Sequence, residues 1–222
     1  MIAFEAGLTQ ILAKTLEPEF ESISLNKALG RITAAHQIAA IDVPSVDNSA
    51  MDGYAIRCAD FARGKAFTVS QRIAAGDLAR ALEPGSVARI FTGAMIPAGA
   101  DAVILQEDSQ SLVEGNLVNF TETPSLGQHI RLAGQDILCQ SEVVAKGHRL
   151  NAGDIGLLAS VGVSQLQCHR PLTVAFFSTG DELKDPEQGL EPGQIYNSNR
   201  YFLAAKIAEC GAIPLDLGRC PD

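Results

Sequence analysis

The 222-residue sequence lacks tryptophan, and aromatic residues make up only 5% of it. Its interior must therefore be packed mainly with Ala, Leu, Ile and Val. Hydrophobic residues reach 46%, which is enough to build a core and excludes a largely disordered chain. The length fits two or three compact units.

Basic residues are also scarce, because Lys and Arg number 17 against 26 Asp and Glu, giving a net charge of -9. A nucleic-acid-binding protein needs a basic stripe that displaces counterions from phosphates, and the sequence has none. We therefore expect no nucleic acid partner.

Long hydrophobic runs and closely spaced cysteines are missing too. No segment approaches the about 18 apolar residues of a membrane span, and the N-terminus has no basic region typical of a secretory signal. The cysteines are odd in number and form no C-x-x-C pair, which favours reduced thiols over disulfides or a zinc site. They are Cys58, Cys139, Cys168, Cys210 and Cys220. These features predict a cytoplasmic protein without a membrane partner.

The first part of the sequence carries helix signals and then loosens. Apolar residues recur at helical spacing within residues 4–12, which predicts a short amphipathic helix. Ser24 is expected to cap one or two turns over residues 25–29 that Gly30 ends, and residues 32–43 are expected to be extended.

Residues 44–132 have a different pattern, in which turn-forming residues separate short β-rich runs. The segment 112–118 predicts a hairpin with its turn at residues 114–116. This stretch is predicted to form a small all-β unit, either a barrel or a sandwich.

The last part of the sequence predicts helices that alternate with strands. Asn151 is expected to cap a helix that Gly162 closes, with Asp154 at its positive N-terminal end. Further on, an apolar run at 172–177, a helix capped at 197–199 and an alternating strand at 213–217 predict one βαβ unit. A single βαβ unit leaves apolar sheet surface bare. We therefore expect either that further strands are missing after residue 222 or that another element covers this surface.

Three polar segments of the first 140 residues are candidates for chemistry. Asp52, in the loop 47–54, is a candidate for presenting a carboxylate to a substrate or to hydrated Mg²⁺, although an Asx-type turn explains the same residues. Thr92, beside Gly93, can donate to an anion, or it belongs to an ordinary loop. Asp136 is either a catalytic carboxylate or a turn residue.

The strongest local signal lies where the buried strand of the βαβ unit ends. Open α/β sheets bind ligands at that edge, and the helix N-terminus supplies free N–H groups for an anion. Hydroxyls, a glycine and two acids there suit a phosphate and a divalent ion, but strand ends and helix caps use the same residues structurally. The residues are Ser178, Thr179, Gly180, Asp181, Glu182, Asn197, Ser198 and Asn199.

Taken together and in order, these segments resemble the MoeA family of molybdopterin molybdenumtransferases, which includes the E domain of gephyrin. The resemblance covers essentially the whole chain and rests on several motifs. They are DNSAMDGYA at 47–55, TGA at 92–94 followed by Pro97 and Gly99, GQDI at 134–137, STGDEL at 178–183 and IYNSN at 195–199.

The resemblance implies an activity and an architecture. The family inserts molybdate into adenylylated molybdopterin, releases AMP with help from Mg²⁺, and forms elongated homodimers. It implies an irregular, discontinuous N-terminal domain at 1–43 and 133–169, with a β-rich domain inserted at 44–132. A parallel α/β, molybdopterin-binding-like domain follows at 170–222, truncated in this sequence. Molybdopterin adenylyltransferase and other proteins of the pathway are the implied partners.

The resemblance also implies roles for the candidate residues. Asp52, Thr92, Asp136 and Glu182 match positions that the family uses for activity, and Ser178, Thr179 and Gly180 would contact phosphates or the pterin. Asp181 and Glu182 are the candidate metal ligands. The family's cleft lies between the β-rich domain of one subunit and the α/β domain of the other. Because later family motifs would lie beyond Asp222, we expect the 222-residue chain alone to be inactive.

Two other functions remain open on the sequence. The chain is either an enzyme of this kind, a non-catalytic dimerisation or scaffold module, or a generic Mg²⁺-dependent phosphohydrolase. Molybdate and tungstate both remain candidates for the inserted ion, because they are tetrahedral dianions of similar size.

Overall fold

A computed structural model describes residues 2–15, 18–112 and 116–220. The chain divides into two compact units. We call Ile38–Glu142 with Ser160–Gly162 the sheet unit, and Met1–Gln37 with Val143–Ala159 and Val163–Asp222 the mixed unit. The predicted domain boundaries at residues 43/44, 132/133 and 169/170 stay predictions. The fold as a whole mixes helices with a mixed β-sheet, as predicted.

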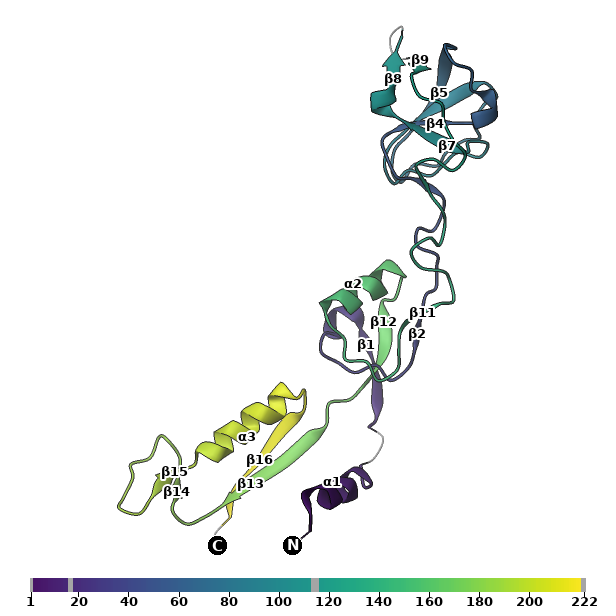
Figure 1. Cartoon of the computed structure of the whole chain (residues 1–222). Helices are drawn as coiled ribbons and strands as arrows, with labels where there is room; N and C mark the ends of the chain where they lie inside the picture. Colours follow the sequence, from purple (N-terminus) through teal and green to yellow (C-terminus); the bar gives the residue numbers. More distant parts are fainter. Residues whose placement is uncertain (1, 16–17, 113–115, 221–222) are drawn as a thin grey trace. The chain divides into compact units, whose positions relative to one another are not determined.

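The sheet unit is built on one six-stranded sheet with the order β7-β4-β6-β5-β9-β8 (Figure 1). Strands β5 and β6 are parallel, and every other neighbouring pair is antiparallel. The strands are β4 (Gly53–Ile56), β5 (Phe67–Ile73), β6 (Ser86–Ile90), β7 (Ala102–Leu105), β8 (Ser109–Ser111) and β9 (Leu117–Phe120). The predicted hairpin is confirmed by the pairing of β8 with β9. Residues 113–115 of its turn lie outside the described residues.

Two apolar clusters pack within the sheet unit. One cluster contains Ala55, Ile73, Ala88, Ile90 and Val103, and the other contains Ile56, Phe67, Val87, Ile104 and Val118. Strand residues alternate between the clusters because successive side chains point to opposite faces. A buried sheet of this kind explains how a chain without tryptophan fills its core.

Short strands and turns accompany the six-stranded sheet along the chain. Strands β3 (Asn48–Ser49) and β10 (Ile130–Arg131) form an antiparallel pair, and β2 (Gln37–Ile38) pairs with β11 (Glu142–Val144). Two 3₁₀ turns, η2 (Cys58–Asp60) and η3 (Gln106–Asp108), lie in loops of the sheet unit.

The mixed unit begins with helix α1 (Phe4–Leu12), which confirms the predicted opening helix. None of its residues is buried. Antiparallel strands β1 (Phe20–Ser24) and β12 (Gln165–His169) and helix α2 (Ala152–Ser160) enclose a small core around Leu150 and Leu158. Across the described residues, no helix combines the length and apolar character that a membrane crossing requires.

The two predicted helix caps of this region have different outcomes. Asn151 Oδ1 accepts the N–H groups of Gly153 (2.7 Å) and Asp154 (3.1 Å), which confirms the N-cap of α2. The prediction for Ser24 is wrong, because its hydroxyl donates to Asn26 Oδ1 at 2.6 Å and caps no helix. The turn that follows is only the 3₁₀ helix η1 (Leu25–Lys27). Since Ser24 ends a paired strand, its side chain bonds a neighbouring side chain instead.

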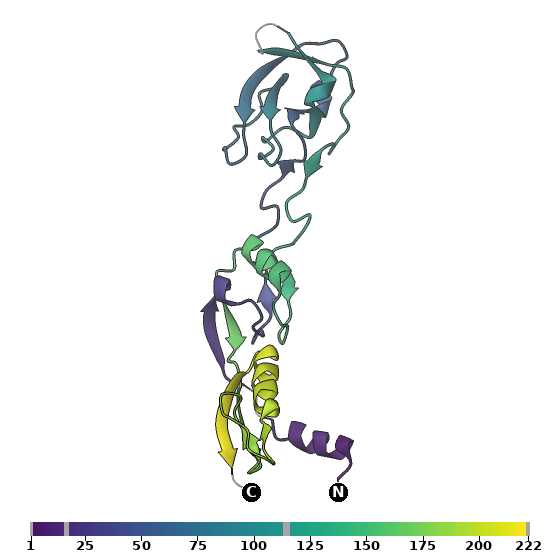
Figure 2. The ribbon, with the colours of Figure 1, turned by 90° about the vertical axis from the view of Figure 1, so that its left-hand side faces the viewer.

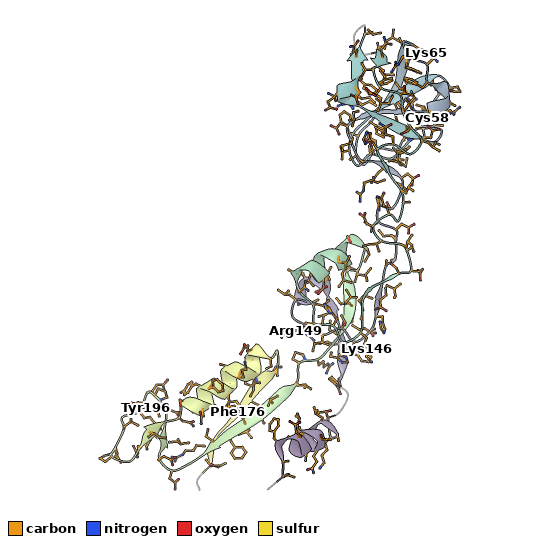
Figure 3. All side chains as sticks on the ribbon, in the orientation of Figure 1. Cys58, Lys65, Lys146, Arg149, Phe176 and Tyr196 are labelled. Carbon is orange, nitrogen blue, oxygen red and sulfur yellow. The ribbon has the colours of Figure 1, made fainter. Side chains whose placement is uncertain are left out.

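The predicted βαβ unit is confirmed. Strands β13 (Thr173–Thr179) and β16 (Ile213–Cys220) pair in parallel, and helix α3 (Ser198–Glu209) lies along one face of the pair in both ribbon views (Figures 1 and 2). The connection also holds a small parallel bridge between β14 (Leu183–Lys184) and β15 (Ile195–Tyr196). In the side-chain view, Phe176 lies at this strand pair and Tyr196 at the bridge (Figure 3).

Candidate functional site

In the sheet unit, the carboxylate of Asp52 is held by Thr92, which follows the end of strand β6. Asp52 Oδ1 accepts both the backbone N–H and the hydroxyl of Thr92, each at 2.8 Å. These two bonds, together with the positive charge of Arg89, lower the pKa of the Asp52 carboxyl below its usual 3.8. Asp52 is therefore a fixed, ionised carboxylate at neutral pH, and the structure joins two of the predicted site residues.

The backbone around Asp52 explains how this geometry is set. The next residue, Gly53, begins β4 so close to β7 that a Cβ would lie 2.0 Å from the Ile104 carbonyl oxygen. On the other side, Gly93 follows Thr92 in the left-handed region (φ 80°) and donates its N–H to the Ser49 carbonyl at 2.8 Å. Glycine is required for the first close approach and favoured for the second turn.

Asp136 lies in another loop of the sheet unit and has a different partner. Its Oδ2 is 2.5 Å from Nη2 of Arg131, and both side chains are about half-exposed. Within the described residues, no hydrogen bond or ion pair joins Asp136 to Asp52 or Thr92. Asp47, from the motif that contains Asp52, accepts the N–H of Ala133, the residue before the motif at 134–137, at 2.8 Å.

In the mixed unit, Asn197 connects the strand end of β13 to helix α3. Its side chain is buried, and its Oδ1 accepts the N–H of Arg200 at 3.2 Å and the hydroxyl of Ser178 at 3.4 Å. The predicted cap is therefore Asn197 alone, since Ser198 and Asn199 are exposed residues of the first helical turn. Ser178 and Asn197, both predicted to bind substrate, thus contact each other, and Asn197 also caps helix α3.

The loop after β13 is shaped by a glycine and an arginine. Gly180 is buried with φ 133°, and a Cβ at this position would come within 2.7 Å of a Glu182 carboxylate oxygen. Arg219 Nη1 donates to the carbonyl oxygens of Asp181 (3.1 Å) and Leu183 (3.2 Å). Thr179 and Asp181 are exposed at the same edge.

Sequence reasoning missed Arg200, which bridges two acidic side chains. Its Nη1 lies 2.7 Å from Asp185 Oδ1 and its Nε lies 2.5 Å from Asp216 Oδ2. The pKa of Asp216 is lowered, first by its bond to Arg200 and then by the N–H of Gly218. No short-range signal reveals this role, because the three residues come from β16, α3 and the loop after β14.

Two of the thiols, those of Cys58 and Cys168, are made less acidic by their surroundings. Burial, followed by the neighbouring Asp101 carboxylate, raises the pKa of the Cys58 thiol to about 11 (Figure 3 shows Cys58 in the sheet unit). Burial also raises the pKa of Cys168. Both cysteines are therefore protonated at neutral pH.

The described residues do not gather a full set of side-chain ligands for Mg²⁺. Nowhere in residues 2–15, 18–112 and 116–220 do three His, Cys, Asp or Glu side chains gather as metal ligands. Mg²⁺ is often held by one or two carboxylates completed by substrate phosphates. Among the described residues, the side chains alone thus do not make a metal site. The roles of Asp181 and Glu182 as ligands stay predictions.

Comparison with known proteins identifies relatives of the whole chain. The family model described as the MoeA N-terminal region (domain I and II) matches residues 2–162. A molybdopterin molybdenumtransferase of Haemophilus influenzae is 39% identical over 224 residues, covering 100% of this chain and 55% of the relative. One of Bacillus subtilis is 35% identical and covers 92% of this chain and 49% of the relative.

Solved structures agree with these relatives. Two structures of molybdopterin biosynthesis protein MoeA from Pyrococcus horikoshii match with TM-scores of 0.90 and 0.89, at 34% and 29% identity. They cover 100% of this chain, which in turn covers 58% and 60% of theirs. The chain spans about half the length of the curated relatives it matches. With a family model over most of its residues and relatives along its full length, this chain belongs to the MoeA family.

Proposed function

We propose that this chain serves molybdenum cofactor biosynthesis as part of a molybdopterin molybdenumtransferase. The reaction is the insertion of molybdate into adenylylated molybdopterin with release of AMP. The observation that carries the proposal is the 39% identity along the whole chain to a protein named for this activity. Molybdate and the adenylylated pterin are substrates in this account, and Mg²⁺ is the proposed cofactor.

Asp52 is the residue to which we assign the most direct chemical role. Thr92 holds Oδ1 with two hydrogen bonds, while Oδ2 accepts no hydrogen bond from any described residue. An ionised carboxylate with one oxygen fixed and one oxygen free can accept a proton or orient a water beside a phosphoanhydride. Such positioning contributes much of the catalysis in phosphoryl chemistry. We propose that Thr92 keeps Asp52 ionised and correctly oriented.

Asp136 and the residues at the end of β13 complete the proposal. Asp136 and Glu182 are assigned to catalysis, and Ser178, Thr179, Gly180, Asn197, Ser198 and Asn199 to substrate binding. For Gly180, the support is a carboxylate in the space that a Cβ would fill. For Asn197, it is a buried amide bonded to both the strand end and the helix.

The finer organisation is part of the same proposal. We propose an irregular N-terminal domain at 1–43 and 133–169, an inserted β-rich domain at 44–132, and the beginning of a molybdopterin-binding-like domain at 170–222. We also propose a cytoplasmic homodimer that receives its substrate from molybdopterin adenylyltransferase. Light scattering tests the dimer, since a monomer at micromolar concentration would contradict it.

A chimera tests the function without assuming where the natural protein ends. This chain replaces the matching part of the Haemophilus influenzae relative, and the chimera is expressed in bacteria that lack their own molybdenumtransferase. We expect it to restore the activity of a molybdenum-dependent enzyme. The Asp52→Asn chimera should fail, whereas Asn151→Ala, which alters only a helix cap, should succeed.

The same experiment separates the proposal from its alternatives. A scaffold module would tolerate Asp52→Asn, because its role needs no ionised carboxylate. A generic phosphohydrolase would not restore the enzyme, although it would hydrolyse simple phosphoanhydrides in a nucleotide turnover assay. Failure of the unmutated chimera to restore activity, when it is folded and expressed, would contradict the proposed function.

A further inference from the structure

Two arginines stand side by side in the sheet unit. Arg72 of β5 and Arg89 of β6 are paired in register across the parallel strands. Their Cζ atoms lie 4.7 Å and 4.4 Å from the centroid of the Phe91 ring, and Arg89 is also 5.3 Å from the Tyr54 ring. Like charges at neighbouring positions of a sheet are destabilising, so this arrangement calls for a compensating group.

The charge of Arg89 lowers the pKa of the Asp52 carboxyl, but within the described residues neither Arg72 nor Arg89 forms an ion pair, in contrast to Arg31, Arg131 and Arg200. The Arg72 side chain also makes no hydrogen bond to any described residue, and Arg72 is exposed. Its guanidinium is therefore held only by the ring beneath it and keeps its donors available.

Arg89, by contrast, is fixed in place. Its Nη1 donates to the carbonyl oxygens of Gly53 and Ile90, both at 2.8 Å, and its Nη2 donates to the side chain of Gln106. These bonds are all to neutral groups, and among the described residues the Asp52 carboxylate, which the charge of Arg89 influences, forms no ion pair with it. One arginine is thus rigid and the other is free to adjust.

The two guanidinium groups line a hollow of about 490 Å³, together with the rings of Tyr54 and Phe91. Gln106, Ser109 and Ser111 complete the lining. The Ser109 hydroxyl donates to the Gln106 carbonyl at 2.6 Å, while the Ser111 side chain has no hydrogen-bond partner among the described residues. The volume lies within the range of about 300–1,000 Å³ that small-molecule sites have.

We propose that this hollow, which we call the arginine pocket, binds a phosphate group. Guanidinium groups match phosphate oxygens with paired N–H donors, and stacking on an aromatic ring orients them for this purpose. Phosphate neutralises the repulsion between Arg72 and Arg89, and a free hydroxyl is available for a further bond. The two arginines concentrate positive charge at this site, although the net charge of the chain is -9. It does not depend on the proposed transferase reaction.

Isothermal titration of the full chain with inorganic phosphate and with AMP, a phosphate monoester, tests the proposal. We expect saturable binding of at least one of them with a Kd below about 1 mM at low salt. Equal affinities would assign the pocket to the free ion, and at least about tenfold tighter binding of AMP would assign it to the phosphate of a larger ligand.

Matched variants make the test specific. Arg72→Gln should weaken binding at least about tenfold, and Arg72→Lys should weaken it less, because a point charge replaces the planar fork. Arg63→Gln, which removes an exposed arginine of the same unit outside the pocket, should bind like the unmutated chain. Equal binding by Arg72→Gln and the unmutated chain, or saturable binding by neither, would overturn the proposal.

Thermal unfolding provides a second readout that does not rely on heat signals. Phosphate should raise the Tm of the unmutated chain and leave that of Arg72→Gln unchanged. In the absence of phosphate, Arg72→Gln should unfold at the same or a higher temperature, because it removes a repulsion. A lower Tm for the variant in phosphate-free buffer would mean that the arginine pair stabilises the fold without a ligand, which contradicts the proposal.

Discussion

The six-stranded sheet and the β13–β16 pair bury their strands to very different degrees. The sheet excludes solvent from residues of both clusters, such as Ile90 and Ile104. In the strand pair only Phe176 is buried, while Phe177 is 54% exposed and Leu215 is 47% exposed. Both regions carry candidate site residues, but the surroundings that hold those residues in place differ.

This difference separates two ways of holding a polar side chain. Asp52 is fixed by the backbone of a packed sheet, through the N–H of Thr92 at a strand end. Asn197 and Ser178 are fixed by each other and by a helix N-terminus. Disturbing the packing should therefore affect the first site, and removing a single polar group should affect the second.

The largest expected effect comes from Gly53→Ala. A Cβ at this position would overlap the Ile104 carbonyl oxygen at 2.0 Å, so β4 and β7 would have to separate. We expect the free energy of unfolding to fall by about 3 kcal/mol or more, measured by urea denaturation. Gly156→Ala is the control, because nothing lies within 4 Å of its Cβ, and it should stabilise helix α2. Equal effects of the two would contradict the close approach.

Phe176→Ala and Phe177→Ala sharpen the comparison within one strand. Phe176 is 8% exposed and Phe177 is 54% exposed. Removing the buried ring should cost about 2–3 kcal/mol, and removing the exposed ring should cost less than about 1 kcal/mol. Chemical denaturation of both variants measures the difference. A larger loss for Phe177 would show that its exposed side chain is covered in solution.

Asn197→Ala removes the cap of α3. Its Oδ1 accepts the N–H of Arg200, and caps of this kind contribute about 1 kcal/mol. We expect a loss of that size in urea denaturation, together with faster amide exchange in the first turn of the helix. Ser198→Ala is the matched control, since Ser198 is exposed and supplies no cap, and it should change little. Identical exchange in both variants would argue against the cap.

The smallest expected effect is electrostatic. Thr92→Val removes the hydroxyl bond to Asp52, so the pKa of the Asp52 carboxyl should rise toward its usual 3.8 while staying below it, because the backbone N–H bond remains. Since the folded pKa is the lower one, this carboxylate stabilises the fold above pH 3.8, and the contribution is lost as the pH falls through the folded value. Carbon-detected NMR titration measures the shift. Thr92→Ser, which keeps the hydroxyl, should show no change.

Local signals in the sequence predicted most of the elements but few of the long-range contacts. Asn151 and Asn197 act within three residues of themselves, so their caps were readable from the sequence. The pairing of β10 with β3 and the bridging role of Arg200 join residues distant along the chain, and periodicity contains no information about them. The cap predicted at Ser24 was wrong because the pairing of its strand outweighed the preference of serine for a helix cap.

The candidate site followed the same division. Asp52 and Thr92 were both selected, but only the structure shows that they bond to each other. The arginine pocket escaped detection because Arg72 and Arg89 become neighbours only through the parallel register of β5 and β6. A single arginine in a strand looks like an ordinary surface residue, and the sequence does not reveal its partner.

The release of AMP from adenylylated molybdopterin, measured with the purified chimera in the presence of molybdate and Mg²⁺, tests the central claim most directly. The account predicts turnover for the unmutated chimera and a loss of at least about 100-fold for Asp52→Asn, since positioned carboxylates contribute factors of this order. Thr92→Ser should remain close to the unmutated rate. Unchanged AMP release by the Asp52→Asn chimera would contradict the account.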